Sequence, residues 1–298
     1  MRVFVTGASG WIGSAVVDEL LATGHEVSGL ARSAASAAKL EAKGVEVRRG
    51  DLDDLAGIRA GAEAADAVIH LANKHDFANP AVSNAAERAA VETLGDALSG
   101  SGRPLLLASG VAGIRQGHPV TEADASPFHG PDSPRGGAEN LALEYADRGV
   151  RPVSLRFSPT VHGTGDHGFI AVLSAIAREK GVSAYPGDGA NRWAAVHVKD
   201  AARMVVLGLE KAPAGTRLHA VAEEGVPTKE IAEAIGRAFD LPVASVAPDD
   251  VAAHYGWIGG FFAMDLAATS AATQELLGWV PDGPTLIEDL DTGAYSGS

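Results

Sequence analysis

The 298-residue sequence contains no cysteine. This absence excludes disulfide bridges, thiol nucleophiles, thiolate metal sites and thiol redox switching, and it fits a reducing compartment. Histidine occurs ten times, but the pairs His162 with His167 and His70 with His75 lack the spacing and the carboxylate partners that zinc sites use. We therefore expect no metal site.

Positive charge is scarce as well, since 24 lysines and arginines stand against 38 aspartates and glutamates, for a formal net charge of −14. Nucleic-acid binding needs a basic stripe that neutralises phosphates, so nucleic acid is not an expected partner. No apolar run is long enough for a membrane span, and a strand pattern starts at Arg2 without room for a signal peptide. We expect a cytoplasmic protein with no membrane partner.

The sequence is rich in glycine at its N-terminus. An apolar run that ends at Thr6 is followed by Gly7, Gly10 and Gly13, and a helical pattern covers 12–23. This spacing lets the backbone turn sharply at the first glycine, approach a pyrophosphate at the second and pack helix on strand at the third. A second strand pattern follows, so the order strand, turn, helix, strand predicts a dinucleotide site at the helix N-terminus.

Short apolar runs then alternate with alanine-rich helical stretches. The runs lie at 45–48, 67–70, 104–108 and 153–157, and the helical stretches at 34–43, 54–61, 84–99 and 136–148. This alternation predicts an α/β fold with a Rossmann-type doubly wound parallel sheet. The pattern changes near residue 162, where glycine-rich loops begin. We expect a dinucleotide-binding domain over 1–161, to which 194–222 returns, and a smaller, discontinuous C-terminal substrate lobe from 162–193 and 223–298.

Cofactor choice in such a fold is decided at the end of the second strand, where an acidic residue would bind the ribose 2′-hydroxyl and repel a 2′-phosphate. The segment 29–33 has no carboxylate and ends in Arg32 and Ser33. A guanidinium fork and a hydroxyl suit a phosphate. We predict NADP(H) in preference to NAD(H), and the alternative is an ordinary surface arginine at a strand end.

Six short segments occur in a characteristic order. They are TGASGWIG at 6–13, GDL at 50–52, VIHLA at 68–72, LAS at 107–109, VHVKD at 196–200 and LGWVP at 277–281. Together they resemble the short-chain dehydrogenase/reductase superfamily in its extended, epimerase-like form, over nearly the whole chain. The resemblance implies an active-site serine at Ser109. The residues expected to contact a nicotinamide dinucleotide are Thr6, Gly7, Ser9, Gly10, Trp11, Ile12, Gly13, Arg32, Ser33, Asp51, Leu52, Leu71, Ala72, Ser109, Glu139 and Pro159. For Asp51 the alternative is a helix cap or a turn residue.

The chain departs from this family where the family places a tyrosine with a lysine four residues later. None of its four tyrosines has a lysine at that spacing, and Arg135 and Glu139 stand at the corresponding place. At i and i+4 of a helix, both are expected on one face toward the cofactor, paired with each other. Arg135 would then stabilise a developing alkoxide, Glu139 would bind ribose hydroxyls, and the proton would come from water or from His162. If both residues act at the site, replacement of Arg135 should lower turnover while the melting temperature barely changes. The alternative is a plain surface ion pair that contributes about a few tenths of a kcal/mol.

These features predict an NADP(H)-dependent oxidoreductase that reduces a carbonyl or related unsaturated group in a small organic substrate. Two alternatives stay open. One is an epimerase or dehydratase that acts on a sugar-like substrate and retains its cofactor. The other is a non-catalytic NADP(H)-binding redox sensor with a protein partner. The resemblance also implies a homodimer formed through the helices expected at 84–99 and 136–148.

Overall fold

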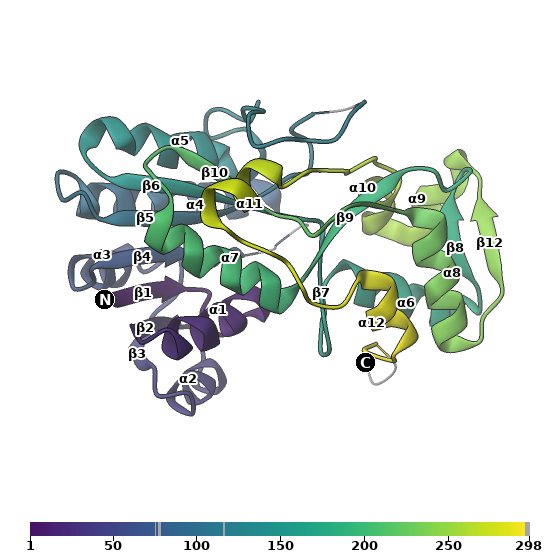
Figure 1. The fold of residues 1–298 in the computed structure, drawn as a ribbon, viewed down its shortest axis with the longest axis horizontal. Coiled ribbons are helices and arrows are strands. Elements are labelled where there is room, and N and C mark those ends of the chain that lie inside the picture. Colours follow the sequence, from purple (N-terminus) through teal and green to yellow (C-terminus); the bar gives the residue numbers. More distant parts are fainter. Residues whose placement is uncertain (75, 77–78, 116, 296–298) are drawn as a thin grey trace.

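The computed structural model describes residues 1–74, 76, 79–115 and 117–295. Its larger part is a seven-stranded sheet in the order β10-β6-β5-β4-β1-β2-β3, in which every neighbouring pair is parallel (Figure 1). The strands are β1 Arg2–Thr6, β2 Glu26–Ala31, β3 Glu46–Arg49, β4 Ala67–His70, β5 Pro104–Gly110, β6 Arg151–Phe157 and β10 Thr216–Ala220. The predicted Rossmann-type sheet is confirmed.

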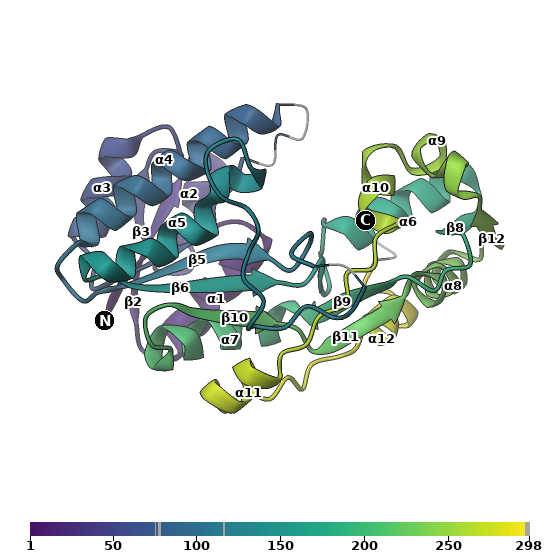
Figure 2. The same ribbon diagram turned by 90° about the horizontal axis from the view of Figure 1, so that it is seen from above.

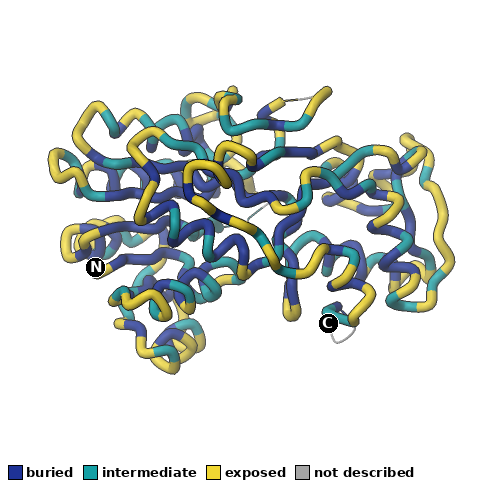
Figure 3. The backbone as a smooth tube through the Cα atoms, viewed as in Figure 1, coloured by how far each residue is buried: buried dark blue, intermediate teal, exposed yellow. Residues whose placement is uncertain are grey.

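Helices cover both faces of this sheet (Figure 2). On one face lie α1 Trp11–Ala22, α2 Ala34–Glu41 and α7 Val198–Lys211, and on the other α3 Leu55–Glu63, α4 Pro80–Leu98 and α5 Ala138–Glu144. Because side chains alternate along a strand, Val3 and Val5 pack toward α1 while Phe4 packs toward α3 and α4. Figure 3 shows the result, with buried residues along the strands and exposed ones on the outer turns and loops.

A second lobe holds two small sheets. One has the order β11-β9-β7, from β7 Thr160–His162, β9 Arg192–His197 and β11 Glu223–Pro227, and the other pairs β8 Ser183–Pro186 with β12 Val243–Val246. Its helices are α6 Phe169–Lys180, α8 Thr228–Phe239, α9 Val251–Tyr255, α10 Gly259–Phe262 and α12 Leu286–Asp291, whereas α11 Ala271–Leu277 packs beside α7. The lobe has an aromatic core in which Trp193 and Phe262 are buried.

The structure corrects two expectations about these elements. Of the segment 194–222, residues 194–197 do not return to the main sheet, because they belong to β9, which pairs with β7 and β11; the return begins with α7 and β10. The helix expected over 136–148 is interrupted. Pro134–Gly137 forms a 3-10 turn in which Arg135 has φ of +54°, α5 follows, and Tyr145–Arg148 is a second 3-10 turn.

Within the described ranges, no helix combines the length and apolarity that a membrane crossing needs.

Candidate active site

The turn between β1 and α1 uses its glycines for steric reasons. Gly7 has φ of +70°, and a Cβ there would lie 2.7 Å from the backbone nitrogen of Ala72. A Cβ at Gly13 would lie 2.0 Å from the carbonyl oxygen of Gly7. Gly10 is exposed at the N-cap of α1, and among the described residues no side chain caps this helix. The open helix N-terminus and the tight turn therefore fit the pyrophosphate of a dinucleotide.

Other residues expected to contact the cofactor lie along the same carboxyl edge of the sheet. Leu71 and Ala72 leave β4 against Gly7, and the backbone N–H of Ala72 donates to Thr6 Oγ1 at 3.3 Å. Ser9, Ile12 and Pro159 are partly exposed, whereas Leu52 is buried. Among these positions, Leu71 and Ala72 lie directly against the glycine turn.

Two residues of this set also have contacts within the protein. Asp51 is exposed, and its carboxylate accepts a hydrogen bond from the backbone N–H of Asp53 at 2.9 Å, as a turn residue does. The indole N–H of Trp11 donates to the carbonyl oxygen of Val161 at 2.7 Å. Trp11 therefore joins the start of α1 to β7 of the second lobe.

The end of β2 carries the predicted phosphate-binding residues. Arg32 is exposed, and Ser33 caps α2 by accepting a hydrogen bond from the backbone N–H of Ser36 at 3.1 Å. Arg49, at the end of the neighbouring β3, is exposed and donates to the carbonyl oxygen of Ser33 at 2.7 Å. Sequence reasoning missed Arg49. The available signal was its position at the end of the strand that follows β2, because neighbouring parallel strands end at the same edge of the sheet.

A pocket of about 150 Å³ opens where β5 ends. Its lining residues are Ala108, Ser109, Gly110, Ala112, Ile114, Ser126, Phe128, Pro134, Arg135, Gly137, Ala138 and Glu139. The pocket thus brings together three of the predicted catalytic residues, Ser109, Arg135 and Glu139, within a mostly apolar wall.

Glu139 forms the polar floor of this pocket. It accepts a hydrogen bond from Ser109 Oγ at 2.7 Å and from Arg156 Nη2 and Nε at 2.6 and 3.0 Å. Arg156 is fully buried in β6, and Arg217 Nε lies 3.5 Å from the same carboxylate. Sequence reasoning missed Arg156, yet an arginine inside an apolar strand signals a buried ion pair because an unpaired buried charge is strongly unfavourable.

Arg135 and Glu139 do not form the pair expected from the sequence. The left-handed backbone of Arg135 places it outside the helix that carries Glu139. Arg135 Nη2 instead donates to Oε1 of Glu87 on α4 at 2.6 Å. Burial raises the pKa of Glu87, but the charge and hydrogen bond of Arg135, the nearby His70 and the hydrogen bond from Asn73 together hold this pKa below its ordinary value.

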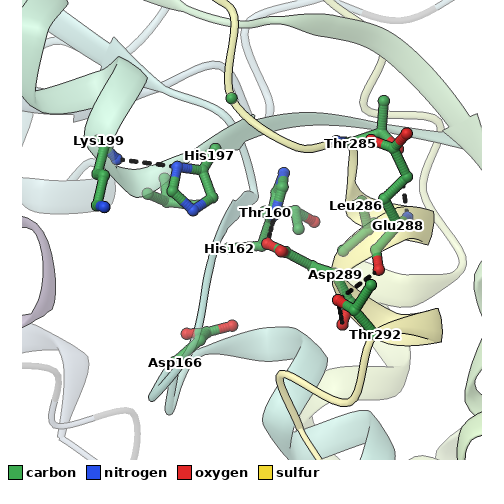
Figure 4. Close-up of polar contacts among 12 residues, drawn as sticks. Thr160, His162, Asp166, His197, Lys199, Thr285, Leu286, Glu288, Asp289 and Thr292 are labelled. Carbon is green, nitrogen blue, oxygen red and sulfur yellow. Dashed lines mark hydrogen bonds and ion pairs between the residues drawn. The ribbon is translucent and has the colours of Figure 1, made fainter.

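His162 lies in a different cluster from Ser109. It is fully buried in β7, and its Nδ1 is 2.6 Å from a carboxylate oxygen of Asp289 on α12 (Figure 4). Its Nε2 is 3.7 Å from Oε2 of Glu223 on β11. His162 is not one of the described residues that line the pocket. His75, considered above with His70, lies outside the described residues.

The sheet, the glycine turn and the pocket define a Rossmann-type dinucleotide-binding protein with an attached second lobe. A family model described as "NAD dependent epimerase/dehydratase family" matches residues 3–221. The chain belongs to this family, and its resemblance to the extended branch of the short-chain dehydrogenases/reductases is confirmed. This places it among NAD(P)-dependent proteins of the oxidoreductase and epimerase type.

The similarity to individual proteins extends over almost the whole chain. A protein of Schizosaccharomyces pombe described as uncharacterized is 45% identical over 295 residues, which cover 99% of this chain and 100% of that protein. A 3-diazoavenalumate denitrifying reductase from a Streptomyces species is 28% identical over 309 residues, covering 97% and 99% of the two chains. The structure is similar to that of UDP-glucose 4-epimerase from Thermus thermophilus, with a TM-score of 0.77, 23% identity and full coverage of both chains.

Proposed function

We propose that the protein is a reductase that uses NADP(H) to reduce a carbonyl or related unsaturated group in a small organic molecule. The observation that carries this proposal is the pocket shared by Ser109 and Arg135, on the same sheet edge as the glycine turn. Arg135 has further N–H groups that can donate to a substrate oxygen, and Ser109 can donate to it when its single hydroxyl proton turns away from Glu139, while the rest of the wall is mostly apolar. A volume of about 150 Å³ suits a group of the size of one benzene ring.

Two relatives that are named as reductases support this choice. One is the Streptomyces denitrifying reductase described above. The other is the 2′-dehydrokanamycin reductase of Streptomyces kanamyceticus, 30% identical over 262 residues that cover 83% of this chain and 69% of that protein.

The cofactor would lie along the carboxyl edge of the sheet. The glycine turn and the N-terminus of α1 would hold the pyrophosphate, and Arg32 with Arg49 would hold the 2′-phosphate. When bound, the dinucleotide supplies the hydride. Two arginines at the ends of β2 and β3 favour NADP(H) over NAD(H).

Ser109, Glu139 and Arg135 then have separate roles. Arg156 donates hydrogen bonds that fix the position of the Glu139 carboxyl group, and Glu139 orients the Ser109 hydroxyl. Both Glu139 oxygens are engaged in this way, which favours orientation of Ser109 over the expected binding of ribose. Arg135 stabilises negative charge on the substrate oxygen but does not release a proton, because a guanidinium stays protonated. Water supplies the proton.

A carbonyl panel tests the proposal. The protein is incubated with NADPH or NADH and benzaldehyde, acetophenone or cyclohexanone, and the loss of reduced nicotinamide absorbance is followed. We expect oxidation of NADPH that is faster than that of NADH. Cofactor retained through purification together with conversion of a sugar nucleotide would favour the epimerase. Tight NADPH binding without turnover of any panel member would favour the redox sensor.

We further propose a homodimer through α4. Its outer side exposes Ala81, Val82 and Ala85, and Val82 is 55% exposed. Small side chains let two helices pack closely. The second expected helix is short, since α5 ends at Glu144, so α4 would supply most of the contact. Light scattering should give twice the mass of one chain, and a single-chain mass would contradict the dimer.

A further inference from the structure

Glu87 is a fully buried carboxylate in the alanine-rich helix α4. Its Oε1 accepts a hydrogen bond from Arg135 Nη2 at 2.6 Å, and its Oε2 accepts one from Asn73 Nδ2 at 3.1 Å. Arg135 is different, because 36% of its side chain is exposed and it lines the pocket. The ion pair therefore connects a buried anion to a cation at the substrate site.

The backbone of Arg135 is held in an unfavourable conformation. Arg135 has φ of +54°, and Gly136 and Gly137 follow at +62° and +67°. For a residue other than glycine the left-handed region is unfavourable, so the surrounding structure must enforce it. Contacts from helix α4 hold this conformation next to the ion pair, since Arg88 Nη1 donates to the carbonyl oxygen of Gly136 at 3.0 Å. A Cβ at Gly136 would also lie 2.6 Å from the carbonyl oxygen of Asn84.

A second group faces the Glu87 carboxylate from the main sheet. His70 of β4 is fully buried, and its Nε2 lies 3.9 Å from Glu87 Oε2. Its Nδ1 is 2.8 Å from Thr6 Oγ1, immediately before the glycine turn. Burial lowers the pKa of His70, and the charge of Glu87 opposes this effect only in part. Arg135 is therefore the main cationic partner of Glu87.

We propose that Glu87 is a positioning residue, whose buried carboxylate fixes the Arg135 guanidinium at the pocket where it meets the substrate oxygen. This inference rests on the role that the proposed function gives to Arg135. A guanidinium on a flexible side chain would sample many positions, whereas one hydrogen-bonded to a buried anion is preorganised for a developing alkoxide. Glu87 itself does not line the pocket among the described residues.

A double-mutant cycle tests this coupling. Arg135→Ala, Glu87→Gln and the double variant are compared with the wild type for kcat and KM, with NADPH and the panel carbonyl that turns over fastest. We expect each single variant to lower kcat ~10–100-fold with an unchanged KM for NADPH. The double variant should be no slower than Arg135→Ala, because Glu87 acts only through Arg135. Glu87→Asp, which keeps the charge, should recover part of the lost kcat.

The melting temperature gives a readout that is independent of turnover. Arg135→Ala leaves a buried carboxylate without its cation, so its melting temperature should fall, contrary to the small change expected from the sequence. Adding Glu87→Gln removes the unpaired charge and should restore part of this loss. Simple addition of the two losses would contradict the ion pair and with it the proposal.

Asp200 provides a matched control. Its side chain is 1% exposed and is paired with Arg203, which is 34% exposed, on α7 and away from the pocket. Asp200→Asn should lower the melting temperature but leave kcat unchanged. If Glu87→Gln behaves like this control while Arg135→Ala loses turnover, the positioning role is wrong and the proposed function stands. If Arg135→Ala turns over like the wild type, the role of Arg135 in the proposed function fails and this inference fails with it.

Discussion

Arg32 is the residue on which the proposed cofactor preference depends most directly. It is exposed at the end of β2. Among the described residues it has no ion pair that would have to break before it binds a 2′-phosphate. Arg32→Ala should weaken NADPH binding by roughly 1.5–3 kcal/mol, the loss of one charge-assisted contact, and leave NADH nearly unchanged. Fluorescence titration with both cofactors measures the difference.

The exposed Arg59 on α3 offers a control for this titration. Arg59→Ala removes the same charge away from the end of β2, so NADPH affinity should stay close to that of the wild type. An equal loss for NADPH and NADH in Arg32→Ala would show that Arg32 does not read the 2′-phosphate.

Ser109 is the second residue with a defined expectation. Its hydroxyl emerges at the end of β5, donates to Glu139 and opens onto the pocket. Ser109→Ala should lower kcat/KM for the carbonyl by roughly 10- to 1000-fold, because an oriented group that meets the reacting oxygen is lost. NADPH affinity should not change. Full activity in this variant would show that Ser109 has no role in the reaction and only marks the end of the strand.

At the scale of elements, one side-chain contact joins the C-terminal helix α12 to β7. His162 and Asp289 are 127 positions apart, and their 2.6 Å contact is buried. His162→Gln should lower the melting temperature by ~2–6 °C, because a buried hydrogen-bonding group loses a partner, while kcat changes little. A large loss of kcat with an unchanged melting temperature would instead support the expected proton transfer by His162.

The regular elements of the main sheet could be predicted because their signals are local. Each strand is a short apolar run between polar turns, and Gly7, Gly10 and Gly13 mark the first turn directly. The break at Arg135 could not be predicted in this way, because α4 imposes it through contacts with residues distant in sequence. The placement of β9 likewise depends on pairing with β7 and β11, which its own residues do not encode.

The candidate site could be predicted where it lies at strand ends, and at Arg135 and Glu139, where the family resemblance marks the position. Ser109 and Arg32 stand at strand ends, and the parallel sheet brings both to one edge. The partners of the candidate catalytic residues are different, because Arg156 comes from the interior of β6 and Glu87 from the middle of a helix. The apolar strand around Arg156 signals a buried ion pair but not its partner, whereas Glu87 looks like an exposed helix residue until tertiary packing buries it.

At the scale of the whole molecule, charge is distributed unevenly between surface and interior. The net charge of −14 is mostly carried by exposed carboxylates, whereas buried Glu87, Glu139 and Asp200 each have an arginine partner. For Glu87, the contacts with Arg135, His70 and Asn73 outweigh burial and hold the pKa below its ordinary value. The stabilisation from this ionised carboxylate is therefore present at neutral pH and is lost as the pH falls.

Asp124, beside the pocket-lining segment, makes this acid response measurable. Hydrogen bonds from the backbone N–H of Thr121 and from Arg115 lower its pKa from 3.8 to about 2. A carboxyl whose pKa is lower in the folded state stabilises the fold above its unfolded pKa, and this stabilisation is lost as the pH falls toward the folded pKa. Asp124→Asn should thus unfold at lower urea concentration than the wild type at pH 7, and about half of the difference should disappear by pH 3. A difference that stays constant between these two pH values would show that the carboxylate charge of Asp124 does not stabilise the protein.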